Sequence, residues 1–381
     1  MDLVGDSMTN LDACYICATP FQLIGAICLV RQNHEIADLY IEDKFKNADI
    51  YAKTIEDAQI FYRVKVIYLK ELFKKYNINE SSNFIRRFTM RISYLFIETI
   101  VNDILFANTM YKLMYVTNQL YIPRIVYMYI QKRSLPTKLI YFDDGSGSYC
   151  NQYFYRSHIL DKIWRFLLFG TYDTDTEVDK RELYLFSPAL CKKIMGSTRT
   201  VKKIDTYNMI HTDSLYKIFS PLSDEISEDV IIMDTVREVF SKQENLLLDS
   251  VYNQIISICG YENVIIKNHP RNVRSHQIKG KYYADSSCPS EVLFSNVSID
   301  SKILIAQFST ALGTPKIIFE KEPIIISLHH IVRKDMMLAD VYFHSLKDLY
   351  KEKWKVFIPN TTDELSEYLK EIKNNFLRYD N

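Results

Sequence analysis

Glycine is scarce in this sequence, with nine residues among 381, and the few glycines do not form either common nucleotide-binding pattern. No GxGxxG opens a helix and no GxxxxGK(S/T) occurs, which removes support for dinucleotide-binding and P-loop proteins. The chain also lacks net charge, since Lys plus Arg and Asp plus Glu both number 47. Nucleic-acid-binding domains are usually basic, so we expect no nucleic-acid partner.

A disulfide framework is not expected either. The seven cysteines are odd in number and scattered along the chain, which is typical of reduced thiols. Cys14 and Cys17 have the spacing of a zinc-binding pair, but no second Cys or His pair follows at a zinc-finger distance. They also lie in an apolar, strand-like run, where positions i and i+3 face opposite sides. We expect both thiols to be structural.

A signal peptide is not indicated, because no basic residue precedes the apolar run at residues 13–30. This run is almost long enough to span a membrane, but Thr19-Pro20 divides it. Residues 13–18 read as a buried strand, with Thr19 as a helix N-cap and Pro20 as the first helical residue. We therefore predict a strand–loop–helix unit and a cytoplasmic protein.

Short apolar runs alternate with longer helical stretches along the chain. The expected strands are residues 37–41, 64–68, 112–116, 138–142, 229–233, 263–267, 302–306, 316–319 and 323–327. Residues 84–108 and 361–376 are expected to be helical. Strands that alternate with helices predict α/β domains with parallel sheets.

The length of the chain is sufficient for two domains. We predict an N-terminal Rossmann-like domain over residues 1–180 and a C-terminal one over residues 181–381, with the hinge within 170–228. Two such domains facing each other would form a cleft at the carboxyl ends of their strands, where α/β proteins bind ligands.

The first polar turn at a predicted strand end is Asp143-Asp144-Gly145. One of the two carboxylates could act as a general base toward a sugar hydroxyl. The glycines of this turn would let a ligand approach the backbone. The alternative is a solvated turn, which Asp and Gly also favour.

The second turn contains Lys267, His269 and Arg271, and Pro270 fixes the chain direction there. These three side chains could meet a phosphate, and a protonated His269 could neutralise the charge of a leaving nucleotide. The alternative is a histidine that is only packed or exposed at the surface.

The third turn is Gln307-Phe308-Ser309-Thr310, after the strand at 302–306. Ser309 would cap a short helix whose exposed amides attract an anion. A simple cap without a ligand is the alternative.

These motifs, FDDGSGSY, KNHPR and FSTALGTPKIIF, follow an N-terminal YICATPFQL in the sequence. Together they resemble the bacterial sialyltransferases of glycosyltransferase family 52, over residues 13 to about 326. The resemblance implies a GT-B fold, CMP-sialic acid as donor, inverting single displacement onto an oligosaccharide, and no metal or other cofactor.

The resemblance also implies roles for individual residues. His269 resembles the histidine that contacts the donor phosphate, and Ser309 and Thr310 resemble the hydroxyls that hold it, with Lys267 and Arg271 nearby. Asp143 and Gly145 match the acidic motif on the acceptor side, where Thr19 and Gln22 are also expected to bind substrate. The base is either Asp144 or Asp234, because related enzymes place it in either loop.

Other interpretations stay open at this point. The same fold could transfer glucose or galactose from a UDP-sugar, or the chain could be a non-catalytic nucleotide-sugar-binding protein of capsule assembly. Basic residues outnumber acidic ones between residues 86 and 133, and residues 157–169 read as an amphipathic helix. Such a surface could rest peripherally on the inner membrane face or form a homodimer. The Asp173-Thr174-Asp175 segment resembles a metal-binding motif, but we expect a solvated turn.

Overall fold

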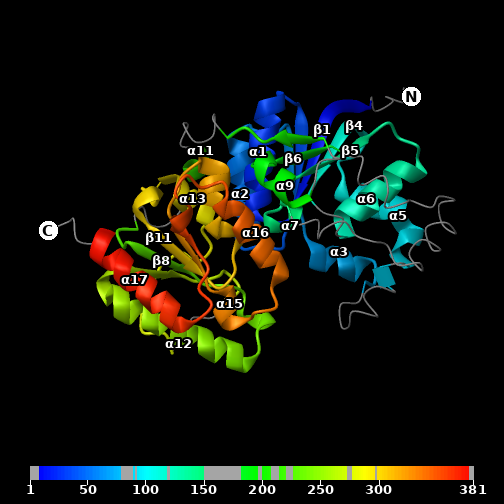
Figure 1. Cartoon of the computed structure of the whole chain (residues 1–381). Helices are drawn as coiled ribbons and strands as arrows, with labels where there is room; N and C mark the ends of the chain where they lie inside the picture. Colours follow the sequence, from blue (N-terminus) through cyan, green and yellow to red (C-terminus); the bar gives the residue numbers. More distant parts are fainter. Residues whose placement is uncertain are drawn as a thin grey trace, which may run out of the picture. The chain divides into compact units, whose positions relative to one another are not determined.

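The computed structural model describes residues 8–78, 89–90, 92–117, 121–149, 182–195, 200–206, 214–219, 226–272, 277–296 and 298–376. The chain divides into two compact domains, Met1–Asn208 and Met209–Asn381 (Figure 1). Each contains a parallel β-sheet flanked by helices, as the alternation of strands and helices predicts.

The first domain has a seven-stranded sheet in the order β3-β2-β1-β4-β5-β6-β7, and every pair is parallel. The strands are β1 (Thr9–Cys17), β2 (Ala37–Glu42), β3 (Arg63–Ile67), β4 (Thr109–Val116), β5 (Lys138–Phe142), β6 (Leu183–Leu185) and β7 (Val201–Lys203). The helices include α1 (Pro20–Asn33), α2 (Ala48–Asp57), α3 (Leu69–Lys75), α5 (Ile97–Ile104), α6 (Tyr121–Lys132), α7 (Ser146–Tyr149) and α9 (Pro188–Met195).

The apolar run at residues 13–30 forms β1 and α1, as predicted. The Thr19 hydroxyl accepts a hydrogen bond from the backbone N–H of Gln22, and Pro20 begins the helix. Residues 22–30 of α1 are all buried, which accounts for their continuous hydrophobicity. No helix in the described part of the chain combines the length and hydropathy that a membrane crossing needs.

The predicted domain boundary at residue 180 is wrong, although the wider hinge region contains the observed one. β6 and β7 lie beyond residue 180 but belong to the first sheet, where β6 pairs with β5. Each of these strands has only three residues, so neither gives the alternating apolar pattern of a longer strand.

The second domain has a six-stranded parallel sheet in the order β10-β9-β8-β11-β12-β13. The strands are β8 (Val230–Met233), β9 (Val264–Lys267), β10 (Lys281–Tyr282), β11 (Ile303–Ala306), β12 (Ile324–Ser327) and β13 (Val356–Phe357). The α-helices are α11 (Ser214–Phe219), α12 (Lys242–Cys259), α13 (Ser290–Asn296), α14 (Thr314–Phe319), α15 (His329–Val332), α16 (Met337–Lys347) and α17 (Thr362–Phe376).

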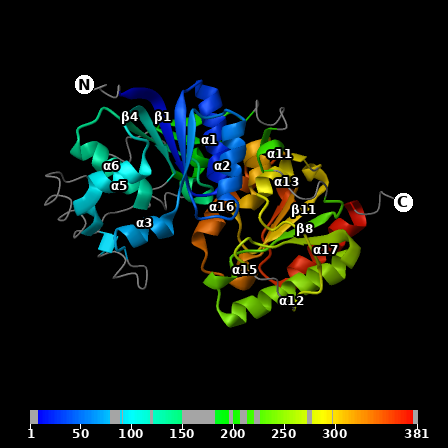
Figure 2. The same ribbon diagram turned by 180° about the vertical axis from the view of Figure 1, so that it is seen from behind.

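Helices α12 and α17 lie side by side against this sheet (Figures 1 and 2). Leu365, Leu369 and Ile372 of α17 are buried in the same core as the four central strands and α12. This confirms the predicted amphipathic helix at the end of the chain. The Ser241 and Glu244 side chains form a capping box that fixes the start of α12.

The prediction of a strand at residues 316–319 is wrong, because these residues lie in helix α14. A short apolar run is consistent with either structure. Here Thr314-Pro315 precedes it, and proline in the first turn favours a helix.

Both sheets reverse their strand order at one point, between β1 and β4 in the first domain and between β8 and β11 in the second. In open parallel sheets, ligands bind beyond the carboxyl ends of the strands at such a reversal. The loops that follow the strands near these two reversals are therefore the first places to look for ligand-binding residues.

Candidate functional site

The turn after β5 is built around the carboxyl group of Asp143. It is completely buried, and it accepts hydrogen bonds from the Gly145 N–H (2.8 Å), the Tyr149 hydroxyl (2.5 Å) and the Phe186 N–H (3.1 Å). Burial raises the pKa of Asp143 to about 7, and the three donors oppose that rise. Gly145 has a φ of 86°, a conformation that favours glycine. Asp143 therefore shapes the turn, and its direct contact with a substrate stays a prediction that its burial among protein donors does not favour.

Asp144 is half-buried, and its carboxylate accepts a hydrogen bond from the Gln22 amide. The Gln22 oxygen accepts one from the Ala18 N–H at 2.6 Å, so the amide orientation is fixed. The Asp144 N–H donates to the Ser148 hydroxyl at 2.7 Å. The Gln22 side chain thus joins the loops after β1 and β5. These two hydrogen bonds explain why a polar residue is buried at position 22. Thr19 lies half-buried in the same loop as the helix cap.

The loop after β8 carries Asp234, which is 8% exposed. Its carboxylate accepts hydrogen bonds from Arg237 Nε at 2.9 Å and from Asn272 Nδ2 at 2.8 Å. Arg237 also donates to Asp249 at 2.7 Å. Burial raises the pKa of Asp234, while the Arg237 charge and the Asn272 bond oppose the rise. Asp234 therefore connects the loops that follow β8 and β9.

His269 is half-buried in the loop after β9, and its Nδ1 accepts a hydrogen bond from the Arg271 N–H at 3.2 Å. A backbone amide can only donate, so the neutral ring carries its proton on Nε2. Burial lowers the pKa of His269 to about 4, helped by the positive charges of Arg271 and Lys267. The low pKa disfavours a protonated His269 in the chain without a bound anion, and the role of the ring beside a nucleotide stays a prediction. The ring instead offers a neutral Nε2–H donor.

The two basic neighbours of His269 have different environments. Arg271 is exposed, as a phosphate contact would require. Lys267 is only 5% exposed and its ammonium donates to the Ser286 carbonyl at 3.4 Å, while burial lowers its pKa. The predicted contact of Lys267 with a donor phosphate stays a prediction, which its burial and its bond to Ser286 do not favour.

The loop after β11 begins the short helix Thr310–Leu312, and the Ser309 hydroxyl accepts from the Ala311 N–H at 3.3 Å. Ser309 is thus the N-cap that the sequence predicts, and it and Thr310 are half-buried. The Thr235 hydroxyl donates to the Phe308 carbonyl at 3.3 Å. This bond joins the β8 and β11 loops across the reversal of strand order.

Two buried amides at these strand ends lie in turns that the sequence analysis singled out, but it gave neither of them a role. Asn268 is 4% exposed and Gln307 is fully buried, yet the amide oxygens of both have no hydrogen-bond partner among the described residues. Asn272, which donates to both Asp234 and the Thr235 carbonyl, was also missed. Asn268 lies within the KNHPR motif, and that motif could have drawn attention to it. Gln307 could have been noticed as the polar residue that directly follows an apolar strand. A buried acceptor without a partner is a place where a ligand donor can bind.

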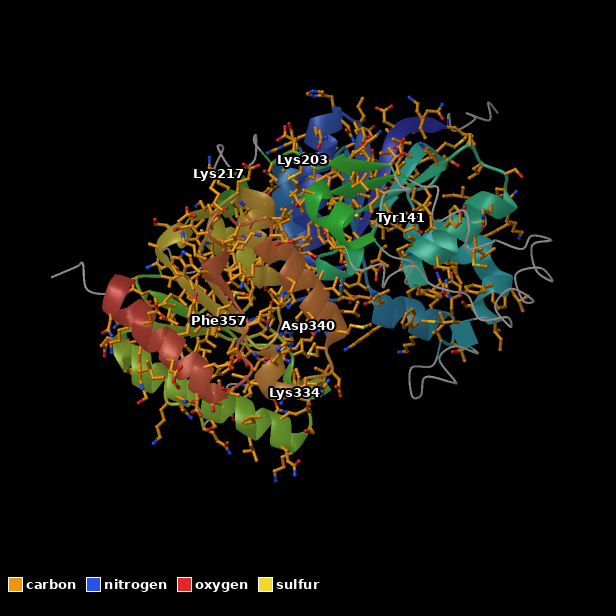
Figure 3. The ribbon with its side chains drawn as sticks, in the orientation of Figure 1. Tyr141, Lys203, Lys217, Lys334, Asp340 and Phe357 are labelled. Carbon is orange, nitrogen blue, oxygen red and sulfur yellow. The ribbon has the colours of Figure 1, made fainter. Side chains whose placement is uncertain are left out.

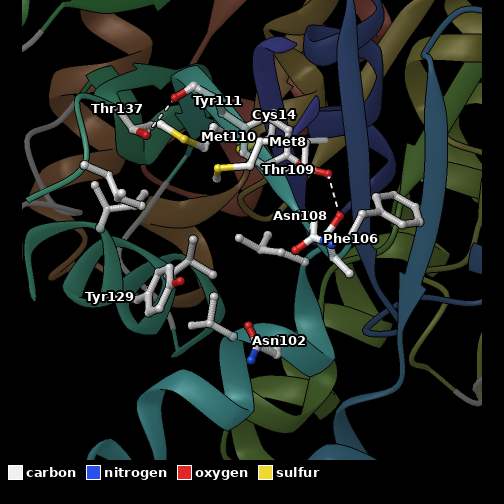
Figure 4. Close-up of a pocket in the computed structure, with 16 residues that line it drawn as sticks. Met8, Cys14, Asn102, Phe106, Asn108, Thr109, Met110, Tyr111, Tyr129 and Thr137 are labelled. Atoms are coloured by element: carbon white, nitrogen blue, oxygen red, sulfur yellow. Dashed lines mark hydrogen bonds between the residues drawn. The ribbon is translucent and has the colours of Figure 1, made fainter. Parts of the chain in front are cut away.

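A pocket of about 180 Å³ in the first domain lies away from these turns (Figure 4). It is formed at the amino end of β4, around Thr109, Met110 and Tyr111, and by α5 and α6. None of the predicted site residues lines it. Its position at the opposite end of the strands separates it from the candidate site.

Several sequence predictions fall outside the described residues, namely the amphipathic helix at 157–169, the Asp173-Thr174-Asp175 segment and the basic residues at 86, 87 and 91. Of the basic residues that are described, Lys112 pairs with Asp12, and Lys132 and Arg133 pair with Glu98. These ion pairs reduce the positive charge that this surface can offer to an anionic lipid.

No protein-family model matches the chain, and no curated protein matches its sequence. Among solved structures, the chain is similar to a kitacinnamycin glycotransferase with a TM-score of 0.51, 6% identity, and coverage of 94% of this chain and 90% of that one. It is also similar to the calicheamicin glycosyltransferase CalG4, with a TM-score of 0.47, 8% identity, and coverage of 97% of this chain and 95% of that one. A third similar structure is UDP-GlcNAc 2-epimerase from Neisseria meningitidis, with a TM-score of 0.45, 11% identity, and coverage of 96% of this chain and 100% of that one.

At these identities, structural likeness speaks for the fold and not for the chemistry. The first comparison covers both parallel-sheet domains in one alignment. The chain therefore has a GT-B type fold built from two Rossmann-like domains.

Proposed function

We propose that the chain is an inverting glycosyltransferase that transfers sialic acid from CMP-sialic acid to a terminal galactose of a surface oligosaccharide, in the cytoplasm and without a metal cofactor. The observation that carries this proposal is the donor-side loop cluster. Hydrogen bonds connect the loops after β8, β9 and β11, and those loops carry a neutral histidine Nε2–H and a serine-capped helical turn. The sequence resemblance to family 52 sialyltransferases supplies the identity of the donor.

In the proposed reaction, an acceptor hydroxyl oxygen attacks the anomeric carbon as the bond from that carbon to the CMP phosphate oxygen breaks. CMP leaves with the electron pair of the broken bond, and negative charge grows on the phosphate. The His269 Nε2–H and the amides and hydroxyls of the Ser309–Thr310 turn donate to that charge, and Arg271 adds a positive side chain. Donors that are already oriented stabilise developing charge without reorganising.

The acceptor proton must go to a base, and we assign Asp144 to this role. Its carboxylate is half-buried and is oriented by the fixed Gln22 amide. Both oxygens of the rival Asp234 already accept bonds from Arg237 or Asn272. Asp234 is accordingly a positioning residue that holds the His269 loop.

The proposal is tested by measuring the release of CMP from CMP-sialic acid, with lactose as acceptor. The assay contains EDTA, to remove metal ions, and is run well below the temperature at which the protein unfolds. We expect wild type to turn over and His269→Ala to lose about 10²–10³-fold in kcat, because a preoriented donor is removed. His344→Ala, which removes an exposed histidine of the same domain, is the matched control and should keep wild-type activity. A wild-type protein that neither hydrolyses nor transfers CMP-sialic acid would refute the donor assignment. Turnover of UDP-sugars would then indicate a glycosyltransferase with a different donor. Binding of a nucleotide sugar without turnover would indicate a non-catalytic nucleotide-sugar-binding protein.

Two alanine variants test the base. Asp144→Ala should lose about 10²–10⁴-fold in kcat, with little change in the unfolding midpoint. Asp234→Ala should unfold more easily, by about 3–5 kcal/mol at most, because it removes the partner of the largely buried Arg237. If Asp144→Ala remains active and a folded Asp234→Ala does not turn over, the assignments must be exchanged.

A further inference from the structure

Two histidines and one aspartate meet in the second domain just beyond β12, outside the groups used in the proposed transfer. His329 and His330 belong to α15, and Asp340 belongs to α16, where Figure 3 labels it. The candidate ligand atoms of these three side chains all lie within 4.8 Å of one another.

The contacts of His329 are compatible with the tautomer that would bind a metal ion through Nε2. Its Nδ1 lies 2.8 Å from the Ser327 hydroxyl oxygen, and that hydroxyl donates its own proton to the Gln307 carbonyl at 3.4 Å. In the tautomer with the proton on Nδ1, His329 donates to this hydroxyl oxygen and its Nε2 presents a lone pair. This Nε2 lies 3.1 Å from Asp340 Oδ1.

His330 has the same arrangement with a different partner. Its Nδ1 lies 3.1 Å from the Asn360 side-chain oxygen, and the amide nitrogen of Asn360 donates to Glu364 at 3.3 Å. The oxygen of Asn360 is thereby directed at the ring, so Nδ1 carries the proton. The Nε2 of His330 lies 2.5 Å from the same Asp340 oxygen.

When both rings carry their proton on Nδ1, two imidazole lone pairs and a carboxylate oxygen converge, and such acceptors repel one another unless positive charge lies among them. Two added protons would create adjacent imidazolium ions with ring centroids 4.4 Å apart, one of them fully buried. A single divalent cation supplies the same charge in one place. We propose that His329, His330 and Asp340 bind a divalent transition-metal ion of the zinc type.

The chemistry of the ligand set fits this ion. Zinc is commonly held by two histidines and a carboxylate at about 2.0–2.2 Å, with a further position left for water. Ligating histidines usually donate their second ring N–H to an outer partner, and the Ser327 hydroxyl and the Asn360 side-chain oxygen are placed to accept from Nδ1 of His329 and His330. The side chains of His330 and Asp340 are 22% and 30% exposed, so an ion can enter from solvent. On binding, the short His330–Asp340 contact must open by several tenths of an ångström.

The ion would join α15 to α16 and bind only the folded domain, and it therefore stabilises the native state. The proposed sialic acid transfer makes no use of it. Zinc binding and transfer can thus be tested separately.

Isothermal titration with ZnCl₂, on full-length chain first stripped with chelator and exchanged into chelator-free buffer, tests the site. We expect about one Zn²⁺ per chain, a higher melting temperature with zinc, and a Co²⁺ complex with visible absorption bands. His330→Ala and Asp340→Asn should abolish this binding. Ser327→Ala should weaken it about 10–100-fold, because it removes only the orienting partner of His329.

His34→Asn, which changes an exposed histidine of the other domain, is the matched control and should bind zinc as wild type does. Circular dichroism shows which variants are folded. If His330→Ala does not fold, Asp340→Asn alone tests the site, because it keeps the shape of the side chain. The proposal is overturned if wild type binds no zinc, or if folded His330→Ala and Asp340→Asn bind it as tightly as wild type.

Discussion

Asp143 shows how a residue of a candidate site motif can serve the fold. Its three hydrogen-bond donors come from the turn itself, from α7 and from the residue after β6. They hold the β5 turn in one shape, and they fix the backbone from which Asp144 projects. The order Asp-Asp-Gly therefore combines a structural carboxyl group with the one that we propose as the base.

We predict that Asp143→Asn destabilises the first domain by about 1–3 kcal/mol, because one face of the amide would oppose a backbone N–H. The pKa of Asp143 is raised to about 7 in the folded chain, so its protonated form stabilises the fold at low pH. That contribution is complete below the unfolded pKa near 4 and is lost as the pH rises through 7. The stability gap between wild type and variant should accordingly be larger at pH 5 than at pH 8, as measured by urea denaturation. An equal gap at both values would contradict the assignment.

The sequence allowed most site positions to be predicted at this scale, but not their chemical states. Asp144, His269 and Ser309 lie at strand ends as expected, because an apolar run followed by a polar turn is a local signal. The burial of Lys267 involves Ser286, which is distant in sequence, and no local pattern records that contact. The pKa of His269 is lowered mainly by its burial, which the sequence does not show, and then by the charges of its sequence neighbours Arg271 and Lys267.

Among the elements, the turn that presents Ser309 is held against α16 through Gly313. A Cβ atom at this position would collide with the Tyr342 hydroxyl and lie 3.2 Å from Leu346. Tyr342 is 1% exposed and cannot easily move aside. The absence of a side chain at residue 313 is thus a packing requirement of the site.

We predict that Gly313→Ala lowers stability by about 1–3 kcal/mol through overpacking. Combining it with Tyr342→Phe removes the colliding oxygen, so the double variant should be less destabilised than the sum of the two single variants. A double-mutant cycle of unfolding free energies measures this coupling, expected at about 0.5–3 kcal/mol. Strict additivity would show that Tyr342 is not the group that excludes the methyl.

Long apolar strands and capped helices were the elements that the sequence indicated well. The run at residues 13–30 was resolved correctly because Thr19-Pro20 carries a cap and a helix start. The run at 316–319 was not, because four apolar residues fit a strand or a helix equally. The two-residue strands β10 and β13 depend entirely on their neighbours in the sheet.

At the scale of the whole molecule, the first sheet contains all seven of its strands only if the first domain extends to residue 208 and not just to residue 180. β6 covers the edge of β5 and supplies the Phe186 N–H that binds Asp143. The 28 residues between 180 and 208 thus contain both β6 and β7.

We predict that a fragment of residues 1–208 is soluble and unfolds cooperatively, whereas one of residues 1–180 aggregates. The shorter fragment exposes the edge of β5, with Tyr141 and Phe142, to other chains. Size-exclusion chromatography and denaturant unfolding of both fragments measure this difference. Equal behaviour would place the structural boundary near residue 180.

The described sheets end in strands that are poor at pairing with another chain. In the first domain, β3 carries Arg63 and Lys65, and β7 carries Lys202 and Lys203. In the second, β10 and β13 have two residues each. Short or cationic edges resist the addition of a further strand. Any self-association of this chain, including the homodimer that the sequence left open, should then use helical surfaces, and the folded protein should resist conversion into fibrils through these edges.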